Sequence, residues 1–237
     1  MGQPSGIGVL DKAVVVLRAT ASGPCALAEL CERTGLPRAT AHRLAVGLEA
    51  HRLLARDAEG RWRPGPALGE LAHGHGDPLL EAAEEVLPRL RDLTSESVQL
   101  YRRDGAARVC VAAAEPASGL RDTVPVGVRL PMSAGSGAKV LAAWPDPAHP
   151  PGPRSPFAPE VLDEVRRRGW AQSVAEREAG VASASAPVHD ATGRVVAAVS
   201  VSGPIDRIGR RPGERFAAEL ATAATELGSR LPGWSRD

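Results

Sequence analysis

Short helical patterns separated by helix-breaking residues occupy the start of this 237-residue chain. Apolar residues recur at helical spacing over 9–19, 27–34 and 36–49, with the tripeptide SGP at 22–24 between the first two runs. Gly35 follows the second run where a left-handed cap favours glycine, and Pro37 suits the first turn of the third helix. The pattern predicts three short helices. In the first, Leu10, Ala13, Val14 and Leu17 lie on one face, which we expect to pack in the core.

A hairpin pattern follows the third helix. Residues 53–56 are typical of a strand, residues 57–60 of a tight turn, and residues 61–63 of the returning strand. Strand alternation places Trp62 opposite Arg61 and Arg63, so we expect Trp62 to pack on the helices and both arginines to face outward. Three helices and a small basic hairpin are typical of a winged helix-turn-helix, whose last helix enters the major groove of DNA.

The third helix has an apolar stripe and a polar side. Thr40, His42 and Arg43 are candidates for contacts with base edges, because hydroxyl, imidazole and guanidinium groups all form hydrogen bonds there. Arg38, together with Arg61 and Arg63 of the hairpin, is better placed for phosphates. An ordinary solvated surface remains the alternative for His42 and Arg43.

The charge of the chain favours a local rather than a global attraction to DNA. The formal net charge is only +1, so no overall field attracts polyanions. Between residues 36 and 65, however, arginines outnumber acidic residues, which supports phosphate contact by this segment.

Several classes of protein are disfavoured by the composition. The three cysteines, Cys25, Cys31 and Cys110, follow no paired spacing, and His73 and His75 have no third ligand nearby, so we expect neither disulfides nor a metal site. The start of the chain has no signal-peptide pattern, and no apolar run approaches the ~20 residues of a membrane span. We therefore expect a cytoplasmic protein without a membrane partner and without a cofactor.

The second part of the chain mixes strands with helices. After a linker helix at about 67–73, Asp77 and Pro78 are suited to begin another helix. Strand patterns follow at 97–101, 107–115, 181–188 and 194–203, and helical patterns at 135–144, 159–168 and 213–231. This mixture predicts an α+β domain, with a mobile proline-rich loop at 145–159.

Small hydroxyl side chains on apolar strands suggest a ligand site. Ser200 and Ser202 share one strand face with Val196 and Ala198, and a buried hydroxyl without a partner costs about 1–3 kcal/mol. The glycine-rich turn at 133–137 enters a helix whose free N–H groups suit a carboxylate. Together these features predict a pocket for a small organic acid or amino acid, although hydrogen bonds to backbone carbonyls could satisfy the serines instead.

Two catalytic alternatives find little support. The segment GSGAK at 135–139 lacks the spacing of a phosphate-binding loop, and Val140 stands where Ser or Thr should bind magnesium. No GxSxG motif is present, and no histidine accompanies a nucleophile. We expect neither catalytic residues nor an enzyme.

The segments GVLDKAVVVLRAT and LAELCERTGLPRATAHRLAVGLEAHRLLARDAEGRWRPGPALGELA resemble the DNA-binding domain of IclR-type bacterial transcriptional regulators. The segments LPMSAGSGAKVLAAW, RRRGWAQSVAEREAGVASASAPV and VVAAVSVSGPIDRI are similar to the effector domain of that family. The resemblance covers nearly the whole chain. More narrowly, the chain resembles the actinobacterial branch that controls amino-acid biosynthesis, leucine-pathway genes in particular.

This resemblance implies a domain organisation and a set of partners. Residues 1–65 would form the winged helix-turn-helix, 66–76 the linker helix, and 77–237 an effector-binding domain related to GAF and PAS modules. The expected partners are a pseudo-palindromic operator in double-stranded DNA, a small-molecule effector that is a carboxylate, and a second copy in a homodimer, with a tetramer as a further state. The expected effector-binding residues are Leu130, Met132, Ser136, Gly137, Ser173, Ser183, Ser200 and Ser202. Ser173 departs from the family, which often has an acidic residue at this place.

A rival interpretation is a metabolite-binding protein whose helical domain mediates protein association. Salt dependence separates the two, because DNA binding weakens steeply as salt rises and an apolar protein interface does not.

Overall fold

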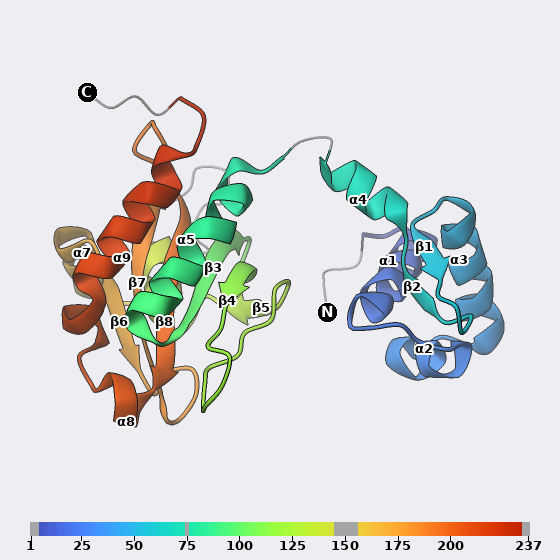
Figure 1. Ribbon diagram of the computed structural model, residues 1–237, viewed down its shortest axis with the longest axis horizontal. Helices are drawn as coiled ribbons and strands as arrows, with labels where there is room; N and C mark the ends of the chain where they lie inside the picture. The colour runs from blue at the N-terminus through green and yellow to red at the C-terminus, as the bar shows by residue number, and fades with distance from the viewer. Residues whose placement is uncertain (1–4, 74–75, 145–155, 234–237) are drawn as a thin grey trace. The chain divides into compact units, whose positions relative to one another are not determined.

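The computed structural model describes residues 5–73, 76–144 and 156–233, and the chain divides into two compact units, 1–76 and 77–237 (Figure 1). Each unit has its own hydrophobic core. His75 and most of the expected proline-rich loop, residues 145–155, lie outside the described residues.

The first unit is a three-helix cluster with a two-stranded wing. The helices are α1 (Gly8–Ala21), α2 (Leu27–Thr34) and α3 (Arg38–Ala50), and the wing pairs β1 (Leu54–Arg56) with β2 (Trp62–Pro64) in antiparallel register. Gly35 ends α2 with a left-handed φ of 68°. Two backbone hydrogen bonds between Cys25 and Trp62, of 2.8 and 2.9 Å, tie the connection between α1 and α2 to the wing. The winged helix-turn-helix expected from the sequence is confirmed.

Trp62 is the largest side chain in the core of the first unit, as its strand position predicts. It is 1% exposed and packs among Val16, Leu30, Ala41 and Ala45. The two alanines of α3 are small, so the indole ring fills the space between the wing and the helices.

The expected core face of α1 is only half correct. Ala13 and Leu17 pack against the core beside the buried Val16, but Leu10 is 49% exposed and Val14 is 37% exposed. Both faces of α1 are apolar, so helical periodicity alone did not distinguish the face that packs inward.

The linker is helical, as the sequence predicts. Helix α4 (Pro66–His73) follows the wing, and α5 (Pro78–Thr94) opens the second unit. The side chain of Asp77 accepts a hydrogen bond of 3.1 Å from the N–H of Leu79, and Pro78 occupies the first helical position. Arg102 forms an ion pair with Asp77 and so ties the start of α5 to the sheet.

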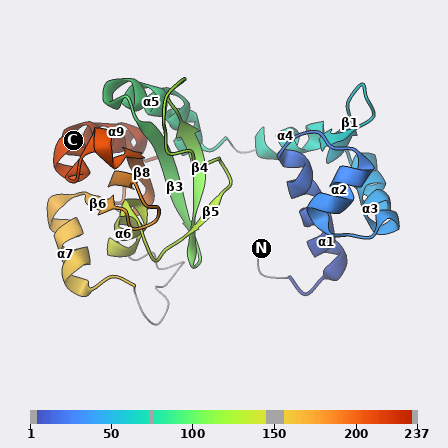
Figure 2. The same ribbon diagram turned by 90° about the horizontal axis from the view of Figure 1, so that it is seen from below.

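The second unit is built on one six-stranded sheet in which every neighbouring pair is antiparallel (Figure 2). Along the sheet the order is β5-β4-β3-β8-β7-β6. The strands are β3 (Ser97–Asp104), β4 (Ala107–Ala114), β5 (Arg129–Pro131), β6 (Ala171–Val174), β7 (Val181–His189) and β8 (Val195–Pro204). The expected α+β class is confirmed.

Helices cover both faces of this sheet and create two cores. One core holds α5 and α9 (Pro212–Ser229) against residues such as Val98 and Val199, with the short α8 (Ile205–Ile208) beside it. The other core holds α6 (Ser136–Ala143) and α7 (Pro159–Arg168) against Tyr101 and Ala198. The short elements β5, β6 and α8 were not predicted from the sequence.

The alternation expected for β8 is correct from residue 197 onward and fails at its start. Val196 packs with the α5–α9 core, whereas the sequence pattern groups it with Ala198, which packs with the α6–α7 core. The register between β7 and β8 shifts at Val188/His189, and such an irregularity turns the preceding side chains to the opposite face.

Among the described helices, none combines the length and the apolar character required to cross a membrane.

Candidate functional sites

The polar side of α3 is turned away from the core. Ala41, Ala45 and Leu48 are buried, and the opposite face is centred on Arg43, which is exposed. Arg38 and His42 are also exposed, whereas Thr40 is only partly so. The small residues Ala39, Gly47 and Ala50 lie near Arg43 on this face, so another surface can approach the helix closely.

The arginines between residues 38 and 63, together with His42, fall into two groups. Arg52 pairs with Glu70, Arg56 pairs with Glu49 and stacks on Trp62, and Arg61 pairs with Asp57 and Glu59. Within residues 5–73, no ion pair is formed by Arg38, His42, Arg43 or Arg63.

This grouping changes the expectation for Arg61. The sequence predicts a phosphate contact for Arg61 as for Arg63, but Arg61 Nε donates a 2.8 Å hydrogen bond to Asp57 and its Nη2 a 3.1 Å hydrogen bond to Glu59. A phosphate would have to compete with two carboxylates for this guanidinium. Arg63, two residues further along in β2, forms no ion pair within residues 5–73 and is the arginine of the wing that remains available.

The first unit therefore presents cations on one helix face and at the wing. A helix of this size fits the major groove of B-DNA, and free guanidinium groups bind base edges and phosphates. The exposed face of α3 is the candidate nucleic-acid interface.

The second unit contains a polar cavity between the first turn of α6 and the sheet. It has room for about one water, with an accessible volume of about 20 Å³. The residues that line it are Gln99, Tyr101, Arg108, Asp122, Gly135, Ser136, Gly137, Ser173, Arg177, Glu178, Val181, Ser183, Ser200 and Ser202.

Six of the eight expected effector-binding residues meet at this cavity: Ser136, Gly137, Ser173, Ser183, Ser200 and Ser202. The other two, Leu130 and Met132, pack instead in the α6–α7 core and do not line the cavity. The sequence pattern did identify them as apolar, but an apolar residue next to a site can equally belong to the core behind it.

Strand register gathers the serines into two adjacent rows across the sheet. One row runs from Ser97 through Ser202 and Ser183 to Ser173. The next row places Gln99 opposite Ser200, and Ser200 opposite Ser185. Residues that face each other on antiparallel strands lie about 4.5–5.5 Å apart, so hydroxyls far apart in the sequence become neighbours.

These hydroxyls satisfy one another rather than backbone carbonyls. Ser136 Oγ lies 2.7 Å from the Oγ atoms of both Ser183 and Ser185, and Ser185 Oγ lies 2.5 Å from that of Ser200. Three hydrogen bonds thus join the four serine hydroxyls in a hydrogen-bonded series. Four hydroxyl hydrogens make three bonds, so one hydrogen remains for an acceptor outside this series. The two end members of this hydrogen-bonded serine series, Ser183 and Ser200, line the cavity.

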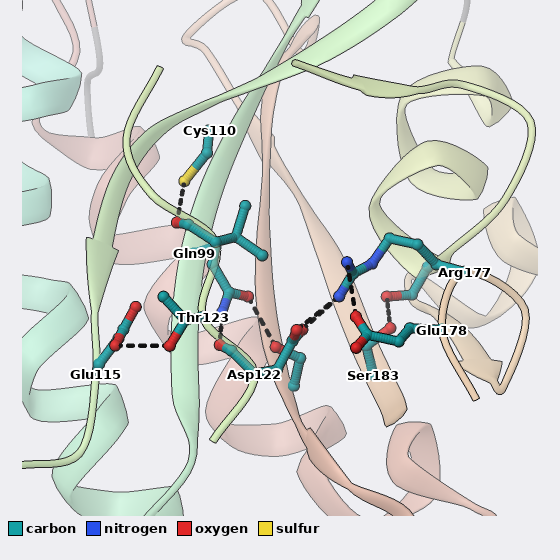
Figure 3. Close-up of polar contacts among 11 residues, drawn as sticks. Gln99, Cys110, Glu115, Asp122, Thr123, Arg177, Glu178 and Ser183 are labelled. Carbon is teal, nitrogen blue, oxygen red and sulfur yellow. Dashed lines mark hydrogen bonds and ion pairs between the residues drawn. The ribbon is translucent and has the colours of Figure 1, made fainter. Parts of the chain in front are cut away.

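An ion pair closes another wall of the cavity (Figure 3). Arg177 Nη2 donates to both carboxylate oxygens of Asp122, at 2.7 and 2.8 Å, and Arg177 also pairs with Glu178. Burial alone would lower the pKa of Arg177, but the hydrogen bond and the charge of Asp122 outweigh it and raise that pKa. Gln99 links this wall to the serines, because it donates to the Asp122 carbonyl and accepts from Ser202 Oγ at 3.1 Å.

Sequence reasoning missed six polar or aromatic residues of the cavity: Gln99, Tyr101, Arg108, Asp122, Arg177 and Glu178. Arg108 carried a usable signal, because it is a charged residue at the start of an otherwise apolar strand. Asp122 lies in an irregular segment that no periodic pattern describes.

Among the described residues, no group of three or more histidine, cysteine or acidic side chains is arranged to hold a metal ion.

Two family profiles match the chain. Residues 9–58 match the family described as "IclR helix-turn-helix domain", and residues 73–150 and 158–229 match "Bacterial transcriptional regulator IclR C-terminal".

Individual proteins match over nearly the full length. The chain is 30% identical to the glycerol operon regulatory protein of Streptomyces griseus, in an alignment that covers 96% of this chain and 95% of that protein. The crystal structure of an IclR homologue from Microbacterium hydrocarbonoxydans complexed with 4-hydroxybenzoate has a TM-score of 0.76 and 23% identity, and covers 95% of this chain and 100% of that one. The IclR structure from Thermotoga maritima gives a TM-score of 0.71 and 23% identity, with coverage of 96% and 100%. These two structures show that the fold is shared.

Proposed function

The chain belongs to the IclR family of bacterial transcriptional regulators, and from this premise we propose which residues read DNA, what the effector domain senses and which genes are controlled. The protein is a DNA-binding transcriptional regulator with an effector-binding domain. The rival role, in which the helical domain serves protein association, loses its motivation with this family membership.

We propose that the exposed face of α3 reads an operator. The observation that carries this proposal is the free guanidinium of Arg43 at the centre of that face, opposite the buried alanines. Arg43 and His42 would contact base edges, with Thr40 at the flank, whereas Arg38 and Arg63 would contact phosphates. Arg61 would contribute less, because Asp57 and Glu59 already hold it.

Replacing Arg43 with alanine is expected to weaken operator binding by about 5- to 150-fold, the loss of about 1–3 kcal/mol from a base contact. Binding to a scrambled duplex should weaken much less, so the preference for the operator should shrink. Fluorescence anisotropy with both duplexes at two salt concentrations measures this.

Two further variants sharpen the test. Arg63→Ala should weaken binding to both duplexes and lower the salt slope by about one. Arg52→Ala, whose guanidinium pairs with Glu70, should change neither. Unchanged discrimination in Arg43→Ala would overturn the assignment of α3 as the recognition helix.

We propose that the effector is a small organic acid or amino acid bound at the polar cavity through its carboxylate, with the cavity widening beyond its room for one water to admit it. The hydrogen-bonded serine series with its spare hydrogen and the first turn of α6 both suit an anionic oxygen acceptor. The Microbacterium relative is described in complex with 4-hydroxybenzoate, which also carries a carboxylate.

The double substitution Ser200→Val with Ser202→Ala is expected to abolish the effect of the effector on operator binding while leaving operator affinity unchanged. Two hydrogen bonds of about 0.5–1.5 kcal/mol each are lost, so effector affinity should fall about tenfold or more. Calorimetry and anisotropy with the same protein sample measure the two quantities. Ser97→Ala is the matched control, because this buried serine has no partner for its hydroxyl among the described residues and does not line the cavity. A normal response in the double variant would make the serines packing residues.

We propose that the protein acts as a homodimer, with a tetramer as a further state. Ile7, directly before α1, and Leu10 and Val14 on α1 follow the spacing i, i+3, i+7. They form an exposed apolar stripe, which a second copy of the chain would bury. A two-fold dimer would require a pseudo-palindromic operator.

We propose, finally, that the target genes belong to amino-acid biosynthesis and to the leucine pathway in particular. This finer assignment rests on the sequence resemblance to the actinobacterial branch. Anisotropy on DNA upstream of the protein's own gene and of adjacent biosynthetic genes tests it, with and without amino acids and the 2-oxo and 2-hydroxy acids of the pathway. Selective binding only to genes of another kind would reject it.

A further inference from the structure

Arg108 is a buried cation without an ion pair. Its side chain on β4 is 3% exposed and lines the cavity. Nη1 donates to the carbonyls of Pro131 and Ala134, but Nε has no hydrogen-bond partner in the described part of the chain. Burial lowers the pKa of its guanidinium, yet an arginine side chain remains protonated in proteins. A buried charge of this kind is costly unless an opposite charge accompanies it.

The acids around the cavity are already engaged by other cations. Asp122 receives two hydrogen bonds from Arg177, and Glu176 pairs with Lys139 and accepts from the N–H of Gly135. Glu178 pairs with Arg177 at the rim, where solvent screens its charge. None of these carboxylates forms an ion pair with Arg108.

The surroundings of Arg108 compensate its charge only in part: two carbonyls accept from Nη1 and the Tyr101 ring centroid lies 5.3 Å from Cζ, but no described carboxylate pairs with it. A Cβ atom on Gly135 would lie 2.9 Å from Arg108 Nη2, and one on Gly137 would lie 3.7 Å from its Cδ, so the guanidinium lies against the first turn of α6. That turn has N–H groups without intrahelical acceptors and the positive end of the helix dipole. Burial is the main cause of the lowered pKa of Arg108; Tyr101 opposes this shift, and the like charge of Arg177 adds to it.

The two glycines make this approach possible. Gly135 has φ of 98°, which favours glycine, and its missing side chain leaves the space that Nη2 occupies. The guanidinium of Arg108 and a helix N-terminus thus meet at one small polar cavity, whose other arginine, Arg177, is already paired with Asp122 and Glu178.

Resting on the proposed function, we infer that Arg108 is the residue that makes an anionic effector obligatory: a ligand carboxylate binds Arg108 together with the first turn of α6. The serine hydroxyls then contact the remaining polar atoms of the ligand. A neutral ligand of the same shape leaves the buried guanidinium uncompensated, so the site discriminates by charge.

The test uses the full chain and a panel of paired probes: acetate, lactate and pyruvate, each against its uncharged carboxamide, with sodium chloride at matched ionic strength. Thermal unfolding identifies which carboxylates stabilise the protein, and calorimetry gives their dissociation constants. At least one carboxylate should bind and no carboxamide should. Arg108→Gln should weaken that carboxylate by about 10- to 100-fold, as for the loss of a charge-assisted hydrogen bond, and Arg108→Lys should weaken it less.

Arg103→Gln on the adjacent strand β3 is the matched control, because this partly exposed arginine donates to the carbonyl of Gly105 and does not line the cavity, so the variant should bind anions normally. If Arg108 is needed only for folding, Arg108→Gln lowers the melting temperature of the ligand-free protein and Arg108→Lys binds like the wild type. That result overturns the inference, as does equal binding of carboxylates and carboxamides, or no binding of any probe.

Operator binding is measured by anisotropy in the same samples, so that failure of the proposed DNA-reading function can be distinguished from failure of the inference about Arg108. Anion binding through Arg108 without selective DNA binding contradicts the proposed DNA-reading role alone. Selective DNA binding without Arg108-dependent anion binding contradicts only this inference.

Discussion

Replacing both Leu10 and Val14 with glutamate is expected to convert the proposed dimer into monomers and to weaken operator binding by about 10²- to 10⁴-fold. The stripe on α1 faces away from the core of its own unit, so the substitutions should not unfold the domain. Four carboxylates would be forced together in a dimer interface that has lost its apolar contacts. Each winged helix-turn-helix would then bind one half-site of the operator alone. The gain in operator affinity that comes from linking two such units in a dimer would disappear.

Light scattering measures the oligomeric state of this variant, and anisotropy measures its operator affinity. Lys12→Glu is the control, because it adds an acidic residue to an exposed position of α1 outside the stripe and should preserve the dimer. A Leu10→Glu/Val14→Glu protein that remains dimeric would place the interface elsewhere.

Replacing Trp62 with alanine is expected to destabilise the first unit by about 3–5 kcal/mol and so to abolish DNA binding at moderate temperature. The indole is 1% exposed, stands against the two small alanines of α3 and lies under the guanidinium of Arg56 at 3.8 Å. A loss of this size is most of the stability of a small domain.

The second unit should remain folded in this variant, because its cores share no residue with that of the first. Chemical denaturation followed by circular dichroism of the helices should show one early transition for Trp62→Ala and an unchanged later one. Trp170→Ala gives the reciprocal control: this ring packs against Gly213 of α9, so only the second unit should weaken. A single transition that shifts in both variants would show that the two units unfold together.

Local chemistry made much of the first unit predictable. The glycine after α2, the proline before α3 and the Asp57–Gly60 turn each act within a few residues, so the helices and the wing appear where the sequence places them. The face of α1 was predicted less well, because Leu10 and Val14 repeat with the same period as core residues. Periodicity shows that a helix has an apolar face, but not whether that face meets its own domain or another copy.

In the second unit, alternation identified serines that share a strand face. It could not show that Ser183 stands opposite Ser202, or that Gln99 accepts a hydrogen bond from Ser202 across 103 positions of sequence. The start of β8 shows the same limit, since one register shift moved Val196 to the other face.

The sequence by itself determined the winged helix, the α+β class, the family and the strand serines, because helix caps, turns and side-chain periods operate over short distances along the chain. The tertiary structure alone decided that Arg108, Asp122 and Arg177 join those serines around one cavity. Sheet order, strand register and the packing of α6 on the sheet bring these residues together, and those depend on the fit of distant segments, which no local pattern records.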